Sequence, residues 1–281
     1  MIAVSETTRA ARYGGAMQPV IVREIRRVSL APAPGAEPIA DRIAVEEPLE
    51  IRVNGKPLAV TLRTPGDDEA LAAGFLHAEG FVSSPDDIAA IRRRAGNVIE
   101  VRLAGGRRRG PAIRPRRFPV TGACGVCGKS GIEQLRFAAP PIVSSLAVAA
   151  TVLRDAAAGL RDAQPLFRLT GGLHGAGVFA ADGTLRVLKE DVGRHNAVDK
   201  AVGALFLERA LPLDDALLVV SGRAGFEIVQ KAVRAGIPVL CAVSAPTSLA
   251  VETAHAFGLT LAGFLRGESM NVYTHPGRIV A

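Results

Sequence analysis

Two cysteines lie two residues apart in the segment Thr121-Gly-Ala-Cys-Gly-Val-Cys-Gly-Lys-Ser130, and a glycine follows each of them. The chain has three cysteines in all, and the third is Cys241. Cysteine this sparse does not make a disulfide framework, and one Cys-x-x-Cys cannot supply four ligands to a structural metal. Cys124 and Cys127 therefore indicate chemistry at a thiolate, which is either redox exchange or the carriage of sulfur.

The residues around the pair favour a reactive thiolate. Ser130-Gly-Ile-Glu133 has the spacing of a capping box, which predicts a helix that begins just after Gly128. A helix N-terminus and a nearby lysine, Lys129, both lower the pKa of a thiol. This argument alone favours Cys127, the residue nearer the helix. The glycines leave room for a large partner to approach the sulfur.

Three other motifs share part of this pattern. Gly128-Lys129-Ser130 matches the end of a phosphate-binding P-loop, but Ala123 replaces the required glycine and no strand precedes it. The absence of a strand before the pair also argues against a thioredoxin, so a dithiol oxidoreductase is kept only as a minor alternative. His77-Ala-Glu79 with the two cysteines is similar to the zinc deaminase signature, although Ala123 replaces its proline. We expect His77 to pack on a partly buried helix face.

The elements that must position these residues fall into two parts, and we expect a fold of the α/β class, α+β overall. Residues 1–18 read as a frayed terminus, and residues 19–140 as a mixed α+β domain that ends in an Arg-rich loop and the cysteine pair. The predicted elements of this domain are a strand at 19–28, a hairpin at 43–62 turning at Asn54-Gly55, helices at 67–79 and from Ser84, and a strand at 98–103.

The second domain is predicted over residues 141–281. A helix at 145–162 precedes a hairpin at 174–188, and helix and strand then alternate to the end of the chain. This alternation is typical of a partly parallel sheet covered by helices. The predicted segments are 194–208, 216–220, 226–234, 238–243, 247–257 and 259–264.

Composition and charge narrow the class of function. The net charge is +7, and residues 92–117 hold ten arginines against one acid, Glu100. Such a stretch is either a solvated loop or an electropositive entrance for an anionic ligand or acidic partner. Aromatic residues make up 4% of the chain and none alternates with these arginines, so nucleic acid is not expected. The sequence contains no long apolar run and no signal peptide, so a cytoplasmic protein without membrane contact is expected.

Four segments of the second domain join small residues to ionisable ones where one predicted element meets the next. In open α/β sheets, ligands bind beyond the carboxyl ends of the strands, where helix N-termini attract phosphate. Each segment alone is more typical of a cap or a turn, but four in one sheet indicate a ligand site. They are Thr170–His174, Glu190–Asn196, Ser221–Arg223 and Ser244–Ser248.

Taken together, these motifs closely resemble those of the formate dehydrogenase accessory sulfurtransferase family (FdhD). The resemblance runs from about residue 20 to the C-terminus. Its most specific stretches are Cys124–Gly128, Thr170–His174, Glu190–Lys200, Ser221–Lys231, Val243–Val251 and Phe264–Pro276.

The resemblance implies a cytoplasmic sulfur carrier. It implies that a cysteine desulfurase passes sulfur to Cys124 as a persulfide, that Cys127 assists, and that the acceptor is a molybdenum or tungsten bis-guanine-dinucleotide cofactor needed by formate dehydrogenase. It also implies a homodimer without a tightly held metal and a C-terminal cytidine-deaminase-like α/β/α domain of three layers. The cofactor-binding residues that we expect are Phe264, Leu265, Arg266, Gly267, Glu268 and Ser269 from the family's loop, together with Ser221, Arg223 and His195.

A second class of function stays open at this stage. The chain could be a non-catalytic chaperone of the cofactor or of the apo-dehydrogenase, in which case the cysteines would only bind a metal or a partner protein. A requirement for the Cys124 thiol separates this alternative from sulfur transfer.

Overall fold

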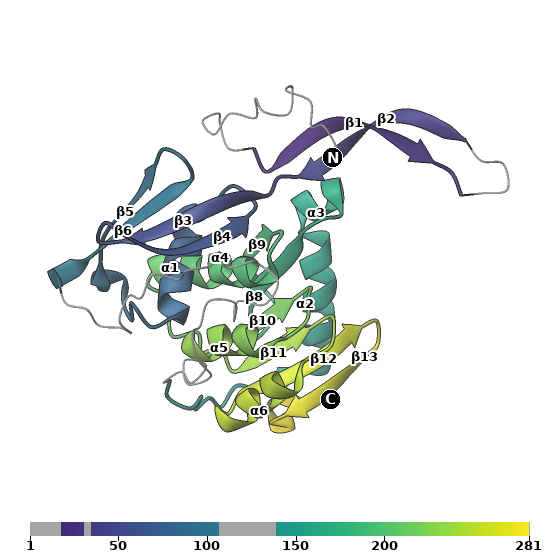
Figure 1. The fold of residues 1–281 in the computed structure, drawn as a ribbon. Helices are drawn as coiled ribbons and strands as arrows, with labels where there is room; N and C mark the ends of the chain where they lie inside the picture. The colour runs from purple at the N-terminus through teal and green to yellow at the C-terminus, as the bar shows by residue number, and fades with distance from the viewer. Residues whose placement is uncertain (1–17, 31–34, 107–138, 281) are drawn as a thin grey trace.

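The computed structural model describes residues 18–30, 35–106 and 139–280. The cysteine pair, the helix expected after Gly128 and six of the ten arginines of residues 92–117 lie outside these ranges, as does nearly all of the expected frayed terminus. The described strands form one six-stranded sheet, one four-stranded sheet and two two-stranded sheets (Figure 1).

The six-stranded sheet is the centre of the C-terminal half. Its strand order is β13-β12-β11-β10-β8-β9, in which β10, β11 and β12 run parallel and the other neighbours pair antiparallel. Every residue of β10, Ala216-Leu-Leu-Val-Val220, is buried, as expected of a strand covered on both faces. The strands are β8 (His174–Ala180), β9 (Leu185–Asp191), β10 (Ala216–Val220), β11 (Val239–Ala242), β12 (Thr260–Arg266) and β13 (Ser269–Thr274).

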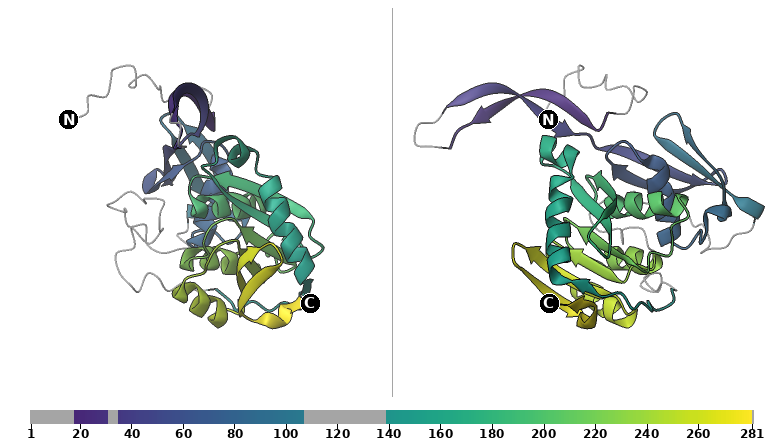
Figure 2. Two further views of the ribbon diagram at one scale, coloured as in Figure 1. Left: turned by 90° about the vertical axis from the view of Figure 1, so that its right-hand side faces the viewer. Right: turned by 180° about the vertical axis from the view of Figure 1, so that it is seen from behind.

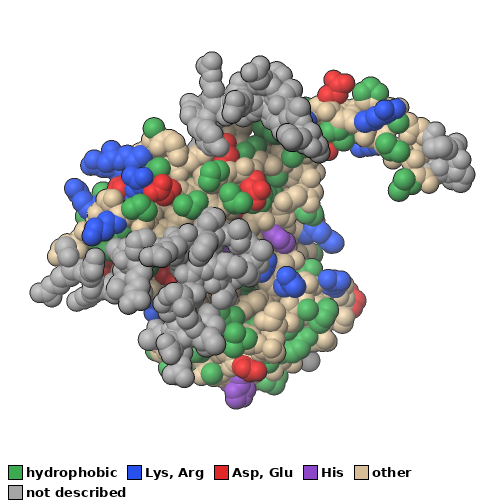
Figure 3. Space-filling model, in the orientation of Figure 1, with side chains coloured by type: hydrophobic (Ala, Val, Ile, Leu, Met, Phe, Trp, Pro, Cys, Tyr) green, Lys and Arg blue, Asp and Glu red, His purple; other side chains and the backbone are tan. Residues whose placement is uncertain are grey.

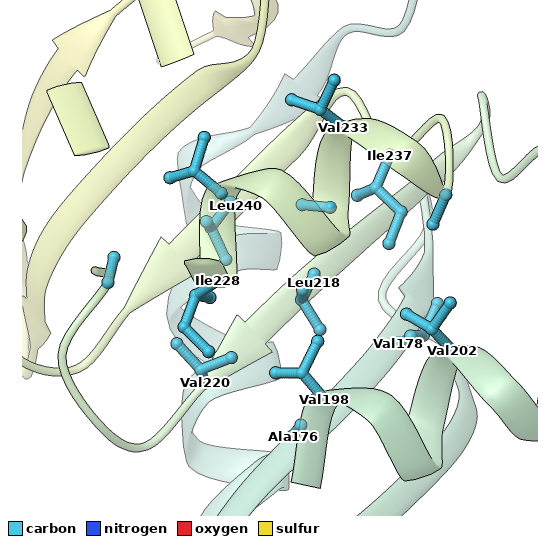
Figure 4. Close-up of a cluster of buried hydrophobic side chains, with 14 of the residues drawn as sticks. Ala176, Val178, Val198, Val202, Leu218, Val220, Ile228, Val233, Ile237 and Leu240 are labelled. Atoms are coloured by element: carbon cyan, nitrogen blue, oxygen red, sulfur yellow. The ribbon is translucent and has the colours of Figure 1, made fainter. Parts of the chain in front are cut away.

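Helices cover both faces of this sheet. On one face the core joins alternate strand residues such as Leu218 and Val220 to α4, α5 and α6, and Figure 4 shows the centre of this cluster. On the other face Leu217 and Val219 pack against α2. The three-layer arrangement expected from the sequence is therefore confirmed. The helices are α2 (Ala150–Asp162), α3 (Pro165–Thr170), α4 (Arg194–Leu207), α5 (Phe226–Arg234) and α6 (Ser248–Ala256).

The N-terminal half contains the four-stranded sheet, with strand order β4-β3-β6-β5, and α1 (Asp68–Ala78). Asn54 and Gly55 make the expected turn, since both have positive φ, at 49° and 79°. Gly80, with φ of 78°, follows the end of α1. The strands are β3 (Glu47–Val53), β4 (Lys56–Arg63), β5 (Ile88–Arg94) and β6 (Val98–Leu103), with 3₁₀ turns at Pro85–Asp87 and Ala104–Gly106.

Helix α1 is packed between this sheet and α4, so the two halves share a helix–helix interface (Figure 2). Two glycines allow the backbones to touch. A Cβ atom built on Gly203 would lie 1.9 Å from the carbonyl oxygen of Ala70, and one built on Gly74 would lie 2.0 Å from that of Asp199. Only glycine fits at either position, so the sequence has fixed how closely the helices approach.

A two-stranded hairpin, β1 (Val20–Val28) with β2 (Ala36–Ala44), projects from the body (Figure 1). Its nine residue pairs are in uninterrupted antiparallel register. The base of β2 contacts α3, and Gly172 lies beside Ala44. The second short sheet pairs β7 (Val148–Ala149) with β14 (Ile279–Val280), next to a 3₁₀ turn at Pro276–Arg278.

Most of the predicted elements are present, and the differences lie at element boundaries and in short elements. The hairpin expected at 43–62 begins at residue 47, because Ile43 belongs to β2, which the alternation at 36–44 was too weak to indicate. The helix expected from Ser84 is a single 3₁₀ turn followed by strand β5. The helix expected at 145–162 begins only at Ala150. Strand β13, which forms a hairpin with β12, and the short helix α3 were also missed.

The boundary proposed near residue 140 stays a prediction. It falls between the last strand of the four-stranded sheet, β6, and the first strand of the six-stranded sheet, β8. No helix within the described ranges combines the length and apolar character needed to cross a membrane.

Candidate functional site

A cavity of about 910 Å³ lies between α2 and the ends of the parallel strands. Its volume suits a ligand of nucleotide size. One wall comes from α2 and the segment that follows it, and the other from residues just beyond β10, β11 and β12. The lining residues are Arg154, Asp155, Ala157, Ala158, Leu160, Arg161, Gln164, Phe167, Gly171, Gly172, Leu173, His174, Ser221, Val243, Leu265, Arg266, Gly267 and Glu268.

The rim of the cavity is charged and its interior is largely apolar. Arg161 and Arg266 are exposed, whereas Leu160, Leu173 and Leu265 are buried. Arg154 reaches across from α2 to Glu268, with Nη1 3.4 Å from the carboxylate oxygen. Figure 3 shows basic side chains, a histidine and an acidic side chain gathered on the flank of the body below the projecting hairpin. An anionic group at the rim and a flat apolar group inside would match this distribution.

The predicted loop from Phe264 to Ser269 comprises the last three residues of β12, the turn at Gly267-Glu268 and the first residue of β13. Leu265, Arg266, Gly267 and Glu268 line the cavity, while Phe264 and Ser269 do not. The Arg266 guanidinium donates from Nε to the carbonyl oxygen of Val243 at 2.9 Å, which ties the turn to the end of β11.

Phe264 is unusual among residues of this turn. It has φ of 53°, a left-handed conformation that is rare for an aromatic residue, and its side chain is exposed. Backbone strain of this kind clusters at ligand-binding segments. Although Phe264 lies outside the cavity lining, it sits directly beside it in the chain.

Ser221 and His174 both line the cavity, and both are partly buried. The Ser221 hydroxyl accepts a hydrogen bond from the backbone N–H of Gly175 at 2.9 Å, so Ser221 fixes the start of β8. Burial, reinforced by the positive charge of Arg194, lowers the pKa of His174 below its usual value. His174 is therefore a neutral imidazole at pH 7, able to donate one hydrogen bond and accept another.

Two further predicted residues lie outside the cavity lining. Arg223 is exposed in the loop between β10 and α5. His195 is buried near the start of α4, and its Nε2 lies 3.3 Å from a carboxylate oxygen of Glu227 on α5. The cavity therefore brings together Ser221 with residues 265–268, and it does not include Arg223 or His195.

The acids of the Glu190–Asn196 segment have structural contacts. Glu190 accepts backbone N–H groups of Leu166 and Phe167 and so caps α3. Asp191 is fully buried and pairs with Lys200 at 2.7 Å. The turn or cap interpretation therefore fits both carboxylates, which hold α3 and α4 in place around the site.

A second buried pair joins α4 to α5. The Asp199 carboxylate lies 2.6 Å from Nζ of Lys231, and burial raises the pKa of Asp199 from 3.8 to about 6. Because this pKa is higher in the folded than in the unfolded chain, the stabilisation linked to Asp199 is fully present below about pH 4. It is lost as the pH rises through about 6.

This linkage predicts a pH-dependent difference between the wild type and Asp199→Asn, which cannot titrate at this position. The free energy of unfolding of the wild type, relative to the variant, is expected to fall by about 1–3 kcal/mol between pH 4 and pH 7. Urea denaturation of both proteins at four pH values in this range measures it. A constant difference across the range would contradict the raised pKa.

Cys241, the third cysteine, does not resemble a sulfur carrier. It lies in β11 with no exposed surface, and burial raises the pKa of its thiol to about 12. A thiol that is neither ionised nor accessible is inert toward a large sulfur donor.

His77 has the packing contacts expected of it. It is buried on α1, its Nε2 lies 3.0 Å from the carbonyl oxygen of Arg234, and its ring stacks at a tilt on Phe206 with centroids 5.2 Å apart. Within the described part of the chain, no three His, Cys, Asp or Glu residues are grouped closely enough to hold a metal ion.

Sequence reasoning missed the contribution of α2. Arg154 and Arg161 of α2 line the cavity, as does Gln164 just after it, yet α2 appeared only as an Ala-rich helix. A periodicity of arginines on one helix face, Arg154 and Arg161 being seven residues apart, is the signal that was present. His174 lies in a segment that the sequence did single out, although it was not among the predicted binding residues.

Comparison with known proteins agrees with this picture. Residues 44–280 match the FdhD/NarQ family. "Sulfur carrier protein FdhD" from Nocardia farcinica is 49% identical over 265 residues, covering 90% of this chain and 93% of that protein. The protein of the same name from Streptomyces coelicolor is 51% identical over 251 residues, covering 85% of this chain and 89% of its own length.

A solved structure shares the architecture as well. The crystal structure of a putative formate dehydrogenase accessory protein from Desulfotalea psychrophila aligns with a TM-score of 0.73 and 27% identity. The alignment covers 92% of this chain and 99% of that one. By sequence and by structure, this chain belongs to the FdhD/NarQ family.

Proposed function

We propose that this protein is a sulfur carrier for formate dehydrogenase. The observation that carries the proposal is the sequence identity of 49–51% between this chain and proteins named as sulfur carriers, over 85–90% of the chain. In this proposal Cys124 accepts sulfur as a persulfide from a cysteine desulfurase. The sulfur then passes to a molybdenum or tungsten bis-guanine-dinucleotide cofactor, which is the protein's substrate.

The sulfur chemistry explains why two cysteines are needed. The Cys124 thiolate attacks the outer sulfur of the donor persulfide, the donor S–S bond breaks, and the donor thiolate leaves. The carried sulfur must gain two electrons to become a sulfide ligand of the metal. If the Cys127 thiolate attacks Sγ of Cys124, sulfide is released and a Cys124–Cys127 disulfide remains, which a cellular dithiol then reduces.

The cavity suits one nucleotide end of such a cofactor. Its arginines favour phosphate, and its apolar walls favour a base. Gly171–His174 and Ser221 in its lining come from segments where the sequence predicted a ligand site. The same proposal includes a homodimer in the cytoplasm, with the desulfurase and apo-formate dehydrogenase as partners.

Intact-protein mass spectrometry tests the carriage of sulfur. After incubation with a cysteine desulfurase and cysteine, the wild type is expected to gain one sulfur atom, located on Cys124 by peptide mapping. Cys241 serves as an internal control and should stay unmodified because it is buried. If the protein gains no sulfur while the desulfurase is active, the proposal is wrong.

The variant Cys124→Ala separates sulfur transfer from a chaperone role. We expect it to bring formate dehydrogenase activity to the background seen without this protein, since in this proposal Cys127 only assists and Cys241 is buried. Cys127→Ala should still load sulfur on Cys124 but deliver it slowly. A Cys124→Ala protein that supports full activity would favour the chaperone.

A further inference from the structure

Gln164 occupies an unusual position in the wall of the cavity. It lies between α2 and α3, only 3% of it is exposed, and it belongs to the cavity lining. Its backbone N–H bonds to the carbonyl oxygen of Arg161. Its side-chain Nε2 is buried and has no hydrogen-bond partner among the described residues. A buried amide group without a partner is strongly unfavourable, so a ligand atom is the natural complement.

The backbone of β8 is shaped to receive this amide. A Cβ atom built on Gly175 would lie 2.5 Å from Cδ, 2.6 Å from Nε2 and 2.8 Å from Oε1 of Gln164. The carboxamide therefore lies flat against a glycine, where any other residue would displace it. The Gly175 backbone is itself held by the Ser221 hydroxyl. The position of the amide is thus built into the strand.

The surroundings of the amide define the chemistry of its partner. Apolar side chains, Leu160 and Leu173 among them, form the inner walls, while the Arg161 guanidinium is exposed at the rim. A hydrocarbon ligand would leave the amide without a partner, and a sugar would leave the apolar walls uncovered. A heteroaromatic base with a hydrogen-bonding edge, joined to phosphates, satisfies the walls, the amide and the rim together.

We propose that the Gln164 carboxamide hydrogen-bonds to the edge of the nucleotide base in the cavity and that Arg161 binds the phosphates. The inference rests on the proposed function for the identity of that base, which is guanine. The adjacent O6 acceptor and N1–H donor of guanine match the donor and acceptor of a carboxamide. Gln164 would thus determine whether the cavity prefers a nucleotide to a bare phosphate anion.

Isothermal titration calorimetry of the full-length protein with GDP and with inorganic pyrophosphate tests this assignment. Gln164→Leu, which keeps the size but removes both polar atoms, is expected to weaken GDP binding about tenfold to a hundredfold. Pyrophosphate binding should not change. Arg161→Ala is the matched control on the same wall and should weaken both ligands by a similar factor.

A second variant keeps the amide but moves it. Gly175→Ala is expected to reproduce the loss of GDP affinity without affecting pyrophosphate, because the new methyl group occupies the place of the carboxamide. If Gln164→Leu does not fold, Gly175→Ala still tests whether the Gln164 amide contributes to GDP binding. Unchanged GDP affinity in a folded variant at either position would overturn the assignment, as would wild-type protein that binds pyrophosphate as tightly as GDP.

Loading of sulfur on Cys124 separates this inference from the proposed function. In the proposed function the wild type accepts sulfur from the desulfurase whether or not Gln164 contacts the base. Normal loading with unchanged GDP affinity refutes the role of Gln164 alone. Absence of loading in the wild type refutes the sulfur carrier, whatever the nucleotide titrations show.

Discussion

Replacing Gly203 by alanine is expected to lower the free energy of unfolding by at least about 2 kcal/mol. The added Cβ would meet the Ala70 carbonyl oxygen at 1.9 Å and the Gly74 nitrogen at 2.6 Å, so α1 and α4 would have to separate. Both contacts are with backbone atoms, which cannot move aside as a flexible side chain does. Overpacking in a tight core typically costs about 1–3 kcal/mol, and helix propensity returns less than about 1 kcal/mol.

The matched control is another helical glycine. Nothing lies within 4 Å of a Cβ built on Gly159 in α2, so Gly159→Ala should stabilise the protein by about 0.5–1 kcal/mol. Guanidinium denaturation of both variants gives the two free energies, which are expected to have opposite signs. Equal stability of Gly203→Ala and wild type would show that the helices are not in the close contact described.

The second large effect is expected from Lys200→Met. Lys200 is 1% exposed, and its ammonium group bonds to Asp191 at 2.7 Å and to the Thr64 carbonyl oxygen at 2.8 Å. Removing the cation leaves the Asp191 carboxylate buried without a counter-charge. Breaking a buried ion pair in this way typically destabilises a protein by about 3–5 kcal/mol.

A double-mutant cycle and a surface pair provide the controls. Adding Asp191→Asn to Lys200→Met should recover part of the lost stability, because the uncompensated charge is then gone. Arg186→Met breaks the Arg186–Asp215 pair, which is 2.5 Å long but partly solvated, and should cost no more than about 1 kcal/mol. Thermal or urea unfolding measures Lys200→Met, Asp191→Asn, the double variant and Arg186→Met. Strictly additive single effects would contradict a direct buried pair.

These two sites explain how the functional cavity is positioned. Gly203 and Gly74 set the distance between the N-terminal sheet and the C-terminal three-layer unit through α1 and α4. Asp191 and Lys200 then fix the chain where β9 meets α4, and Glu190 caps α3 beside the cavity. The residues of the Glu190–Lys200 segment thus support the site from behind, while residues from α2 and from the turn after β12 form its surface.

The amino-acid sequence alone determined the order and type of most elements in the second half. Runs such as Ala216–Val220 are short, apolar and bounded by turn residues, and such local patterns identify a buried strand without reference to its neighbours. The sequence also singled out the cysteine pair and the segments that place the chain in its family. Each of these signals lies within a short contiguous stretch of residues, so it can be recognised without knowing the fold.

Only the tertiary structure decided which residues share the cavity. Arg161 and Gln164 meet Leu265 and Arg266 across about a hundred residues of chain, because α2 covers the face of the sheet at whose edge β12 ends. It also decided that Asp191 and Lys200 form a buried pair and that Gly175 makes room for the Gln164 amide. Contacts between residues so far apart in the chain leave no periodic trace in a single sequence, since they are set by how the layers pack.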